Sequence, residues 1–117
     1  MSDLPTPPKR YTDFVKRYPK LGQAWEHIAE AGKEGPLDHK TVRLLKLAIA
    51  IGAQREGAVH ASVRKALAQG TTREEMEQIV AVAAGTIGMP ATVAAYSWIQ
   101  DEFEGKPGSK ANPGKQE

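Results

Sequence analysis

Cysteine is absent from the 117 residues of this sequence. Its absence excludes disulfide bonds, thiolate zinc sites, iron–sulfur clusters, cysteine nucleophiles and any thiol redox cycle. Long apolar runs are also missing. The longest near-apolar stretch, Leu44–Ala53, is interrupted by Lys46 and is far shorter than the ~20 residues of a membrane-spanning helix. The first residues show no apolar run typical of a secretory signal, so we expect a cytoplasmic protein with no membrane partner.

A strong charge of either sign is missing as well. The chain has 16 Lys and Arg against 14 Asp and Glu, and residues 11–104 hold 11 basic and 12 acidic residues. The pI near 8.9 therefore arises from the ends of the chain. A nucleic-acid-binding domain is expected to carry a basic stripe on its folded part. We find no such stripe and expect no nucleic-acid partner.

The length of the chain suggests one domain. Residues 1–8 and 105–117 are rich in Pro, Gly or Lys and poor in apolar side chains, which predicts a disordered arm at each end. Between them, residues 9–104 show apolar side chains at helical spacing, interrupted by helix-ending residues. The sequence therefore predicts an all-α, single-domain helical bundle of about five to six helices.

Local signals place the ends of these helices. Pro19 fits the first turn of a new helix, and Asp38 is a suitable N-cap for a helix over residues 39–53. Gly70 is typical of the position after a helix, and Thr72 with Glu75 forms a capping box. The Gly88-Met89-Pro90 segment predicts a break before the last helix.

The helix expected over residues 39–53 is apolar around most of its axis. A helix of this kind must be covered on every side. In so small a chain, this predicts a central helix, a subunit interface, or both. We therefore expect a homo-oligomer.

Four features between residues 36 and 99 occur in an order that is specific in combination. They are Leu37-Asp38 before a helix, the helix end Val63-Arg64-Lys65-Ala66-Leu67 followed by Gly70, the Thr71-Thr72-x-Glu74-Glu75 cap, and the Gly88-Met89-Pro90-Ala91 break. With these features the segment resembles the carboxymuconolactone decarboxylase family, including its alkyl hydroperoxidase D-like branch. The resemblance implies an all-helical fold that assembles as trimers, or as hexamers built from two trimers.

The catalytic residues of that family are not retained. The redox branch uses a Cys-x-x-Cys pair, a His four residues later and an upstream Glu. Here Arg55 and Ala58 stand at the two cysteine positions, Ser62 stands at the His position, and Arg43 lies near the Glu position. Peroxide and disulfide chemistry require a thiolate, so we expect the peroxiredoxin-type activity to be absent. The decarboxylase branch uses a His at the position of Ser62, so its mechanism does not transfer either.

His60 is the local candidate for catalysis. It lies four residues after Glu56, so the two side chains share one face of a helix. A carboxylate orients an imidazole and supports general acid–base catalysis. The alternative is an exposed pair without a catalytic role.

Arg43, Arg55 and Ser62 are the candidate substrate-binding residues. Arginines brought together by a helical hairpin would hold a substrate carboxylate bidentately. The alternative is a solvated polar rim or an intersubunit ion pair. We expect no metal and no cofactor, because the His residues lie on three separate elements without a ligand spacing such as HExxH, and no phosphate loop occurs.

Two functions follow from this interpretation. The first is a cysteine-free lyase or proton-transfer enzyme acting on a small carboxylate, with His60 as acid or base and Glu56 orienting it. The second is a non-catalytic oligomeric binding or scaffold protein that has lost the redox site.

Overall fold

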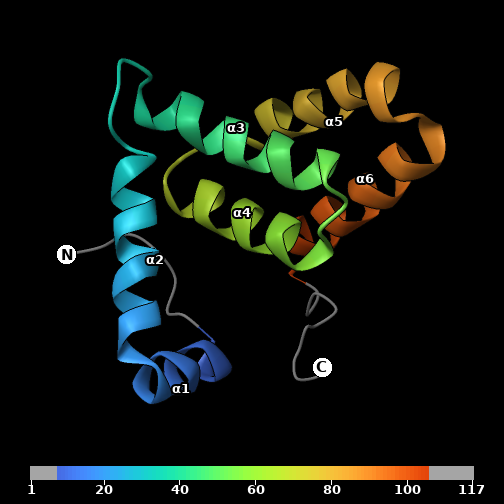
Figure 1. Cartoon of the computed structure of the whole chain (residues 1–117). Helices are drawn as coiled ribbons and strands as arrows, with labels where there is room; N and C mark the ends of the chain where they lie inside the picture. The colour runs from blue at the N-terminus through green and yellow to red at the C-terminus, as the bar shows by residue number, and fades with distance from the viewer. Residues whose placement is uncertain (1–7, 106–117) are drawn as a thin grey trace.

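The computed structural model describes residues 8–105. It contains the helices α1 (Lys9–Arg17), α2 (Pro19–Ala31), α3 (His39–Gly52), α4 (Glu56–Ala68), α5 (Arg73–Ile87) and α6 (Met89–Phe103) (Figure 1). No strand occurs within this range, which confirms the predicted all-α bundle. The two arms predicted to be disordered, 1–8 and 105–117, lie outside the described residues except for Pro8 and Gly105.

Helices α3 to α6 form the bundle. α3 packs against α4 and α5, and α6 packs against the same two helices, so each member of the bundle has two neighbours. The core is made of one apolar stripe from each helix. It comprises Leu47, Ala50, Ile51, Val59, Val63, Ala66, Met76, Val80, Ala95, Ile99 and Phe103. None of the described helices is long and apolar enough to span a membrane.

The predicted caps are present. The Asp38 carboxylate accepts a 2.7 Å hydrogen bond from the Thr41 backbone N–H, and this bonding lowers the pKa of Asp38. Thr72 and Glu75 form the complete capping box at the start of α5. Pro19 occupies the first turn of α2 as expected. The side chains of Asp38 and Thr72 accept hydrogen bonds from backbone N–H groups that have no partner within their own helix.

Gly88 joins α5 to α6 with φ 86° and ψ 163°, a backbone conformation that residues with a side chain rarely adopt. A Cβ added there would meet no atom within 4 Å. The cost of a side chain is therefore purely conformational. Since its carbonyl also accepts a 2.7 Å hydrogen bond from the Thr92 hydroxyl, the turn has little freedom to relax.

We expect Gly88→Ala to lower the free energy of unfolding by about 1–3 kcal/mol, because alanine is strained at this φ and ψ. Gly85→Ala is the matched control. Gly85 lies within α5, and a Cβ there also meets no atom within 4 Å, so alanine should raise stability by up to about 1 kcal/mol. Chemical denaturation of both variants measures the difference. Equal stability of the two would contradict the conformational explanation.

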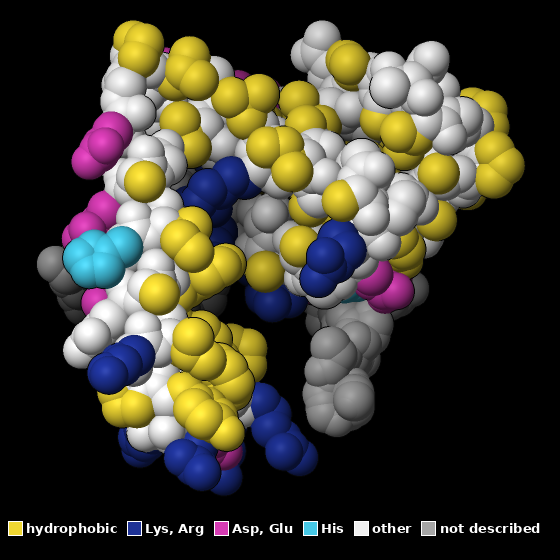
Figure 2. Space-filling model, in the orientation of Figure 1, with side chains coloured by type: hydrophobic (Ala, Val, Ile, Leu, Met, Phe, Trp, Pro, Cys, Tyr) yellow, Lys and Arg dark blue, Asp and Glu magenta, His cyan; other side chains and the backbone are white. Residues whose placement is uncertain are grey.

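α1 and α2 form an arm, residues 9–31, that stands beside the bundle (Figure 1). The two helices pack against each other. The ring of Phe14 on α1 lies 5.3 Å from that of Tyr18, the residue that joins the two helices. Neither helix contains a buried residue. The large apolar side chains of the arm are between 36% and 60% exposed, namely Tyr11, Phe14, Tyr18, Leu21, Trp25 and Ile28. Figure 2 shows hydrophobic side chains gathered over α1 and α2, with a hollow between the arm and the bundle.

α3 is covered on only part of its circumference. Leu47 and Ile51 are fully buried, whereas Ile49 is 69% exposed. A single copy of the chain therefore leaves apolar surface of α3 in water.

Candidate functional site

His60 lies in the second turn of α4, on the side of the helix that faces the bundle. Its neighbours on that face, Val59 and Val63, are fully buried, and His60 itself is 3% exposed. Gln54, two residues before the first residue of α4, has a φ of 54° and lies in the turn from α3 into α4. The Gln54 side chain donates a 2.8 Å hydrogen bond to the carbonyl of Ile51, which stabilises this turn. The local fold thus holds a polar ring at the edge of the core.

Each ring nitrogen of His60 faces a carboxylate. Nδ1 lies 2.7 Å from Oε2 of Glu102, and Nε2 lies 3.3 Å from Oε2 of Glu56. The two acids differ in exposure, since the Glu102 side chain is 8% exposed and that of Glu56 is 49% exposed. The predicted pair of Glu56 and His60 therefore forms, but a second and more buried carboxylate makes the shorter contact.

A ring nitrogen that bonds to a carboxylate does so as a donor, because an ionised carboxylate only accepts hydrogen bonds. A neutral imidazole has one N–H and an imidazolium has two. The contact between Nδ1 and Glu102 is the shorter of the two, and Nε2 lies on the side of the half-exposed Glu56.

Glu102 is the functional residue that the sequence interpretation missed. It belongs to α6 and is separated from His60 by 42 positions, so no local spacing connects them. Oε2 of Glu102 also accepts a 3.0 Å hydrogen bond from Nη1 of Arg64, one turn after His60 on α4. A signal was nevertheless present, because Glu102 occupies an acidic position within the stripe of Ala95, Ile99 and Phe103. A carboxylate at helical spacing within a buried stripe requires a buried partner.

The structure does not gather the remaining predicted site residues around His60. Ser62 lies two positions further along α4, where helical geometry turns it to a different face. Arg55 is exposed at the N-cap of α4, next to Glu56. Arg43 lies in the first turns of α3, and its Nε donates a 3.2 Å hydrogen bond to Oε1 of Gln69, beyond the other end of α4.

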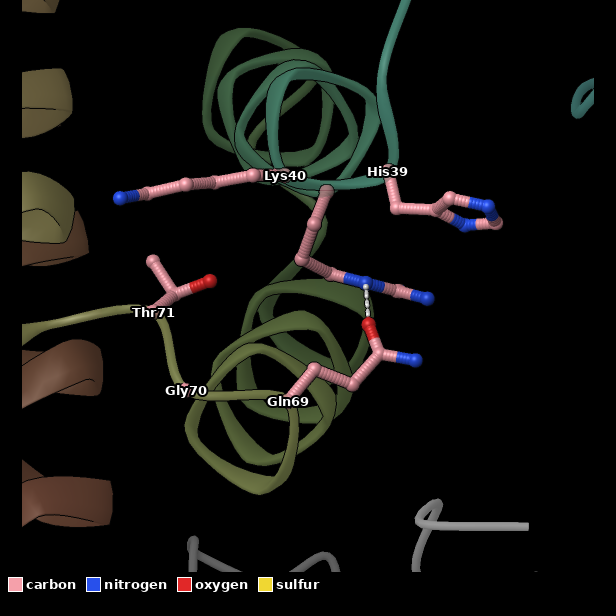
Figure 3. Close-up of a pocket in the computed structure, with 6 residues that line it drawn as sticks. His39, Lys40, Gln69, Gly70 and Thr71 are labelled. Atoms are coloured by element: carbon pink, nitrogen blue, oxygen red, sulfur yellow. Dashed lines mark hydrogen bonds between the residues drawn. The ribbon is translucent and has the colours of Figure 1, made fainter.

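The surroundings of Arg43 form a cavity of about 310 Å³. It is lined by His39, Lys40, Arg43, Gln69, Gly70 and Thr71 (Figure 3). His60 is not among the lining residues. The structure thus places the proton-transfer candidate and the cavity at different ends of the α3–α4 pair.

The model of the carboxymuconolactone decarboxylase family matches residues 19–101, which is most of the chain. The chain belongs to the carboxymuconolactone decarboxylase family. The match also covers α2, which lies outside the segment whose motifs carried the resemblance. No curated protein and no solved structure gives a significant match to the chain.

Membership in the carboxymuconolactone decarboxylase family fixes the fold and leaves the chemistry to be found in this chain's own residues. Its cysteine count of zero leaves no thiolate for the redox reactions of that family. Over residues 8–105, no three His, Asp or Glu side chains are arranged to hold a metal ion. Glu56 and Glu102 lie on opposite nitrogens of one ring, which suits proton transfer.

Proposed function

We propose that this protein is a cysteine-independent proton-transfer enzyme of the lyase type that acts on a small carboxylate. The observation that carries the proposal is the histidine with a buried carboxylate on Nδ1 and a half-exposed carboxylate on Nε2. The family name describes decarboxylation of a lactone carboxylate, and such a reaction needs a proton delivered to carbon. His60 is the side chain that this geometry equips for that step.

Each residue of this cluster has a separate role in the proposed reaction. Glu102 accepts a hydrogen bond from Nδ1 of His60 and so holds the ring in one orientation. Arg64 donates a hydrogen bond to the same oxygen of Glu102 and fixes this carboxylate in place. Nε2 takes a proton from solvent through Glu56 and delivers it to the substrate carbon. In a decarboxylation, the electron pair of the breaking C–C bond goes to the product carbon framework, CO2 leaves, and the proton from Nε2 completes the product. Movement of the half-exposed Glu56 side chain opens Nε2 to the substrate.

We further propose that the chain works as a homo-oligomer, a trimer or a hexamer of two trimers. The support is the exposed apolar surface of the arm together with Ile49. Contiguous apolar patches larger than a few hundred Å² are unusual on monomers, and closed symmetry covers them economically. A neighbouring copy also offers the wall that a small substrate needs beside Glu56.

The experiment is a screen in D2O with small 3-oxo acids and unsaturated lactone carboxylates, followed by NMR for deuterium incorporation and CO2 loss. We expect catalysed exchange or decarboxylation above a no-enzyme control. Hydroperoxides with a thiol donor are the contrasting substrates, and we expect no turnover because the chain has no thiolate. Sustained peroxide reduction would contradict the proposal.

A non-catalytic binding protein is the second candidate. It is favoured by one observation, that the cavity lined by Arg43 does not include His60. In that case His60 would serve only to join α4 to α6 through Glu102. Absence of exchange with every carboxylate in the screen, together with saturable ligand binding, would select this function.

A further inference from the structure

We propose that the cavity at the start of α3 binds a compact, doubly charged oxyanion, and that a phosphate group on a small molecule is its best match. The site is independent of the proton-transfer site. Gln69, which lies at this cavity, is the C-cap of α4 and follows His60 by nine positions. That spacing corresponds to about 13 Å along a helix. The proposal therefore stands or falls separately from the function proposed above.

Arg43 supplies the first part of the site. It is half-buried, and the bond from its Nε to Gln69 holds the guanidinium plane in place (Figure 3). No described residue accepts a hydrogen bond from its two terminal nitrogens. A guanidinium fixed in this way presents two parallel N–H donors, which is the geometry that binds phosphate and carboxylate oxygens.

Thr71 supplies an independent observation. The residue is 5% exposed, and its hydroxyl has no hydrogen-bond partner among residues 8–105. Figure 3 shows this hydroxyl pointing into the cavity, between the start of α3 and the end of α4. Buried polar groups nearly always have a partner, so a buried hydroxyl directed into a polar cavity indicates a ligand that accepts a hydrogen bond from it.

The charge around the cavity favours an anion. Lys46 and Lys65 lie near Arg43, and none of the three forms an ion pair within the described range. Burial lowers the pKa of both lysines, and the positive charge of Arg43 lowers them further. Neither lysine lines the cavity, but both lie close enough to Arg43 for like-charge repulsion, which an anion bound at Arg43 would reduce.

The neighbouring groups narrow the choice of ligand. Lys40 already forms an ion pair with Glu75, and Figure 3 shows it pointing away from His39 and Gln69. The backbone N–H groups of Gly70 and Thr71 are bonded within the chain. The ligand therefore interacts with side chains. Arg43 at the cavity, with Lys46 and Lys65 nearby, favours two negative charges over one. A cavity volume of about 310 Å³ suits a small molecule.

The test is calorimetric titration of the full chain with inorganic phosphate at fixed ionic strength, with malonate as the dicarboxylate and chloride as the background anion. We expect saturable binding of phosphate and weaker binding of malonate. Arg43→Gln should weaken phosphate binding about 10- to 100-fold, since it removes a charge-assisted bidentate contact. Thr71→Val should weaken it about 5-fold through the loss of one hydrogen bond, and Thr71→Ser should restore it.

Arg10→Gln is the matched control. It removes one positive charge from an exposed position on α1, away from the cavity, and should leave the affinity unchanged. Thermal unfolding of each variant verifies that it is folded. No saturable binding by the wild type, equal affinity of Arg43→Gln and wild type, or tighter binding of malonate than of phosphate would each overturn the proposal.

Discussion

Replacing His60 by alanine is expected to lower turnover of the carboxylate substrate by about 100- to 10,000-fold, the usual contribution of a general acid or base. The reason is that His60, which lies between a buried and a half-exposed carboxylate, is the residue that transfers the proton in the proposed mechanism. Turnover is measured by the deuterium-exchange or CO2-release assay. His60→Gln accompanies the alanine variant, because glutamine preserves a hydrogen-bond donor toward Glu102 but does not act as an acid or a base.

Variants of the two carboxylates next to His60 distinguish the orientation of its ring from proton transfer. Glu102→Gln should lower turnover and alter its pH profile, because it replaces the carboxylate that makes the short contact with Nδ1 of His60 by a neutral amide. Glu56→Gln should have a smaller effect, since the Glu56 contact to His60 is longer and more exposed. Glu34→Gln, at an exposed position between α2 and α3, is the charge-matched control. Unchanged turnover in a folded His60 variant would end the catalytic interpretation.

Replacing Ile49 by aspartate is expected to abolish assembly while the chain stays folded. Ile49 is 69% exposed in the single chain, so a carboxylate there remains hydrated in the monomer but would be buried in an interface. Ile51→Asp should instead prevent folding, because Ile51 is fully buried in the core. Sedimentation equilibrium should report a monomer of 12.7 kDa for Ile49→Asp, and circular dichroism should show wild-type helix content.

Gln78→Asp provides the control for the assembly experiment. Gln78 is already polar and exposed on α5, so an added carboxylate should leave the oligomer intact. A wild-type protein that sediments as a stable monomer at micromolar concentration would refute the proposed assembly. Assembly that survives Ile49→Asp would place the interface elsewhere.

The fold could be predicted because its determinants are local. Asp38 and the pair of Thr72 and Glu75 each act over three residues, and those contacts form as expected. Pro19 likewise begins a helix through its own geometry. Helix ends therefore followed from short segments, and the family resemblance supplied the bundle that packs them.

Of the contacts at the candidate site, only the one within α4 could be predicted from the sequence. The contact between Glu56 and His60 follows from helical spacing. The contact from His60 to Glu102 depends on how α4 packs against α6, which no short segment determines. The same reason explains why Arg43 lies by Gln69 and not by His60. A hairpin brings two helices together, but the register between the helices decides which residues of one helix lie opposite a given side chain of the other.

The arm has a consequence for how the protein behaves on dilution. Helices of 9 and 13 residues are too short to be stable alone in water, and neither α1 nor α2 has a buried residue of its own to stabilise it. In the proposed assembly, the arm is ordered by surface that a neighbouring copy provides. Its backbone protection against hydrogen exchange therefore follows mass action and rises with protein concentration. The bundle's protection, by contrast, is a property of one chain, so a single polypeptide contains one part whose order is intrinsic and another whose order is shared.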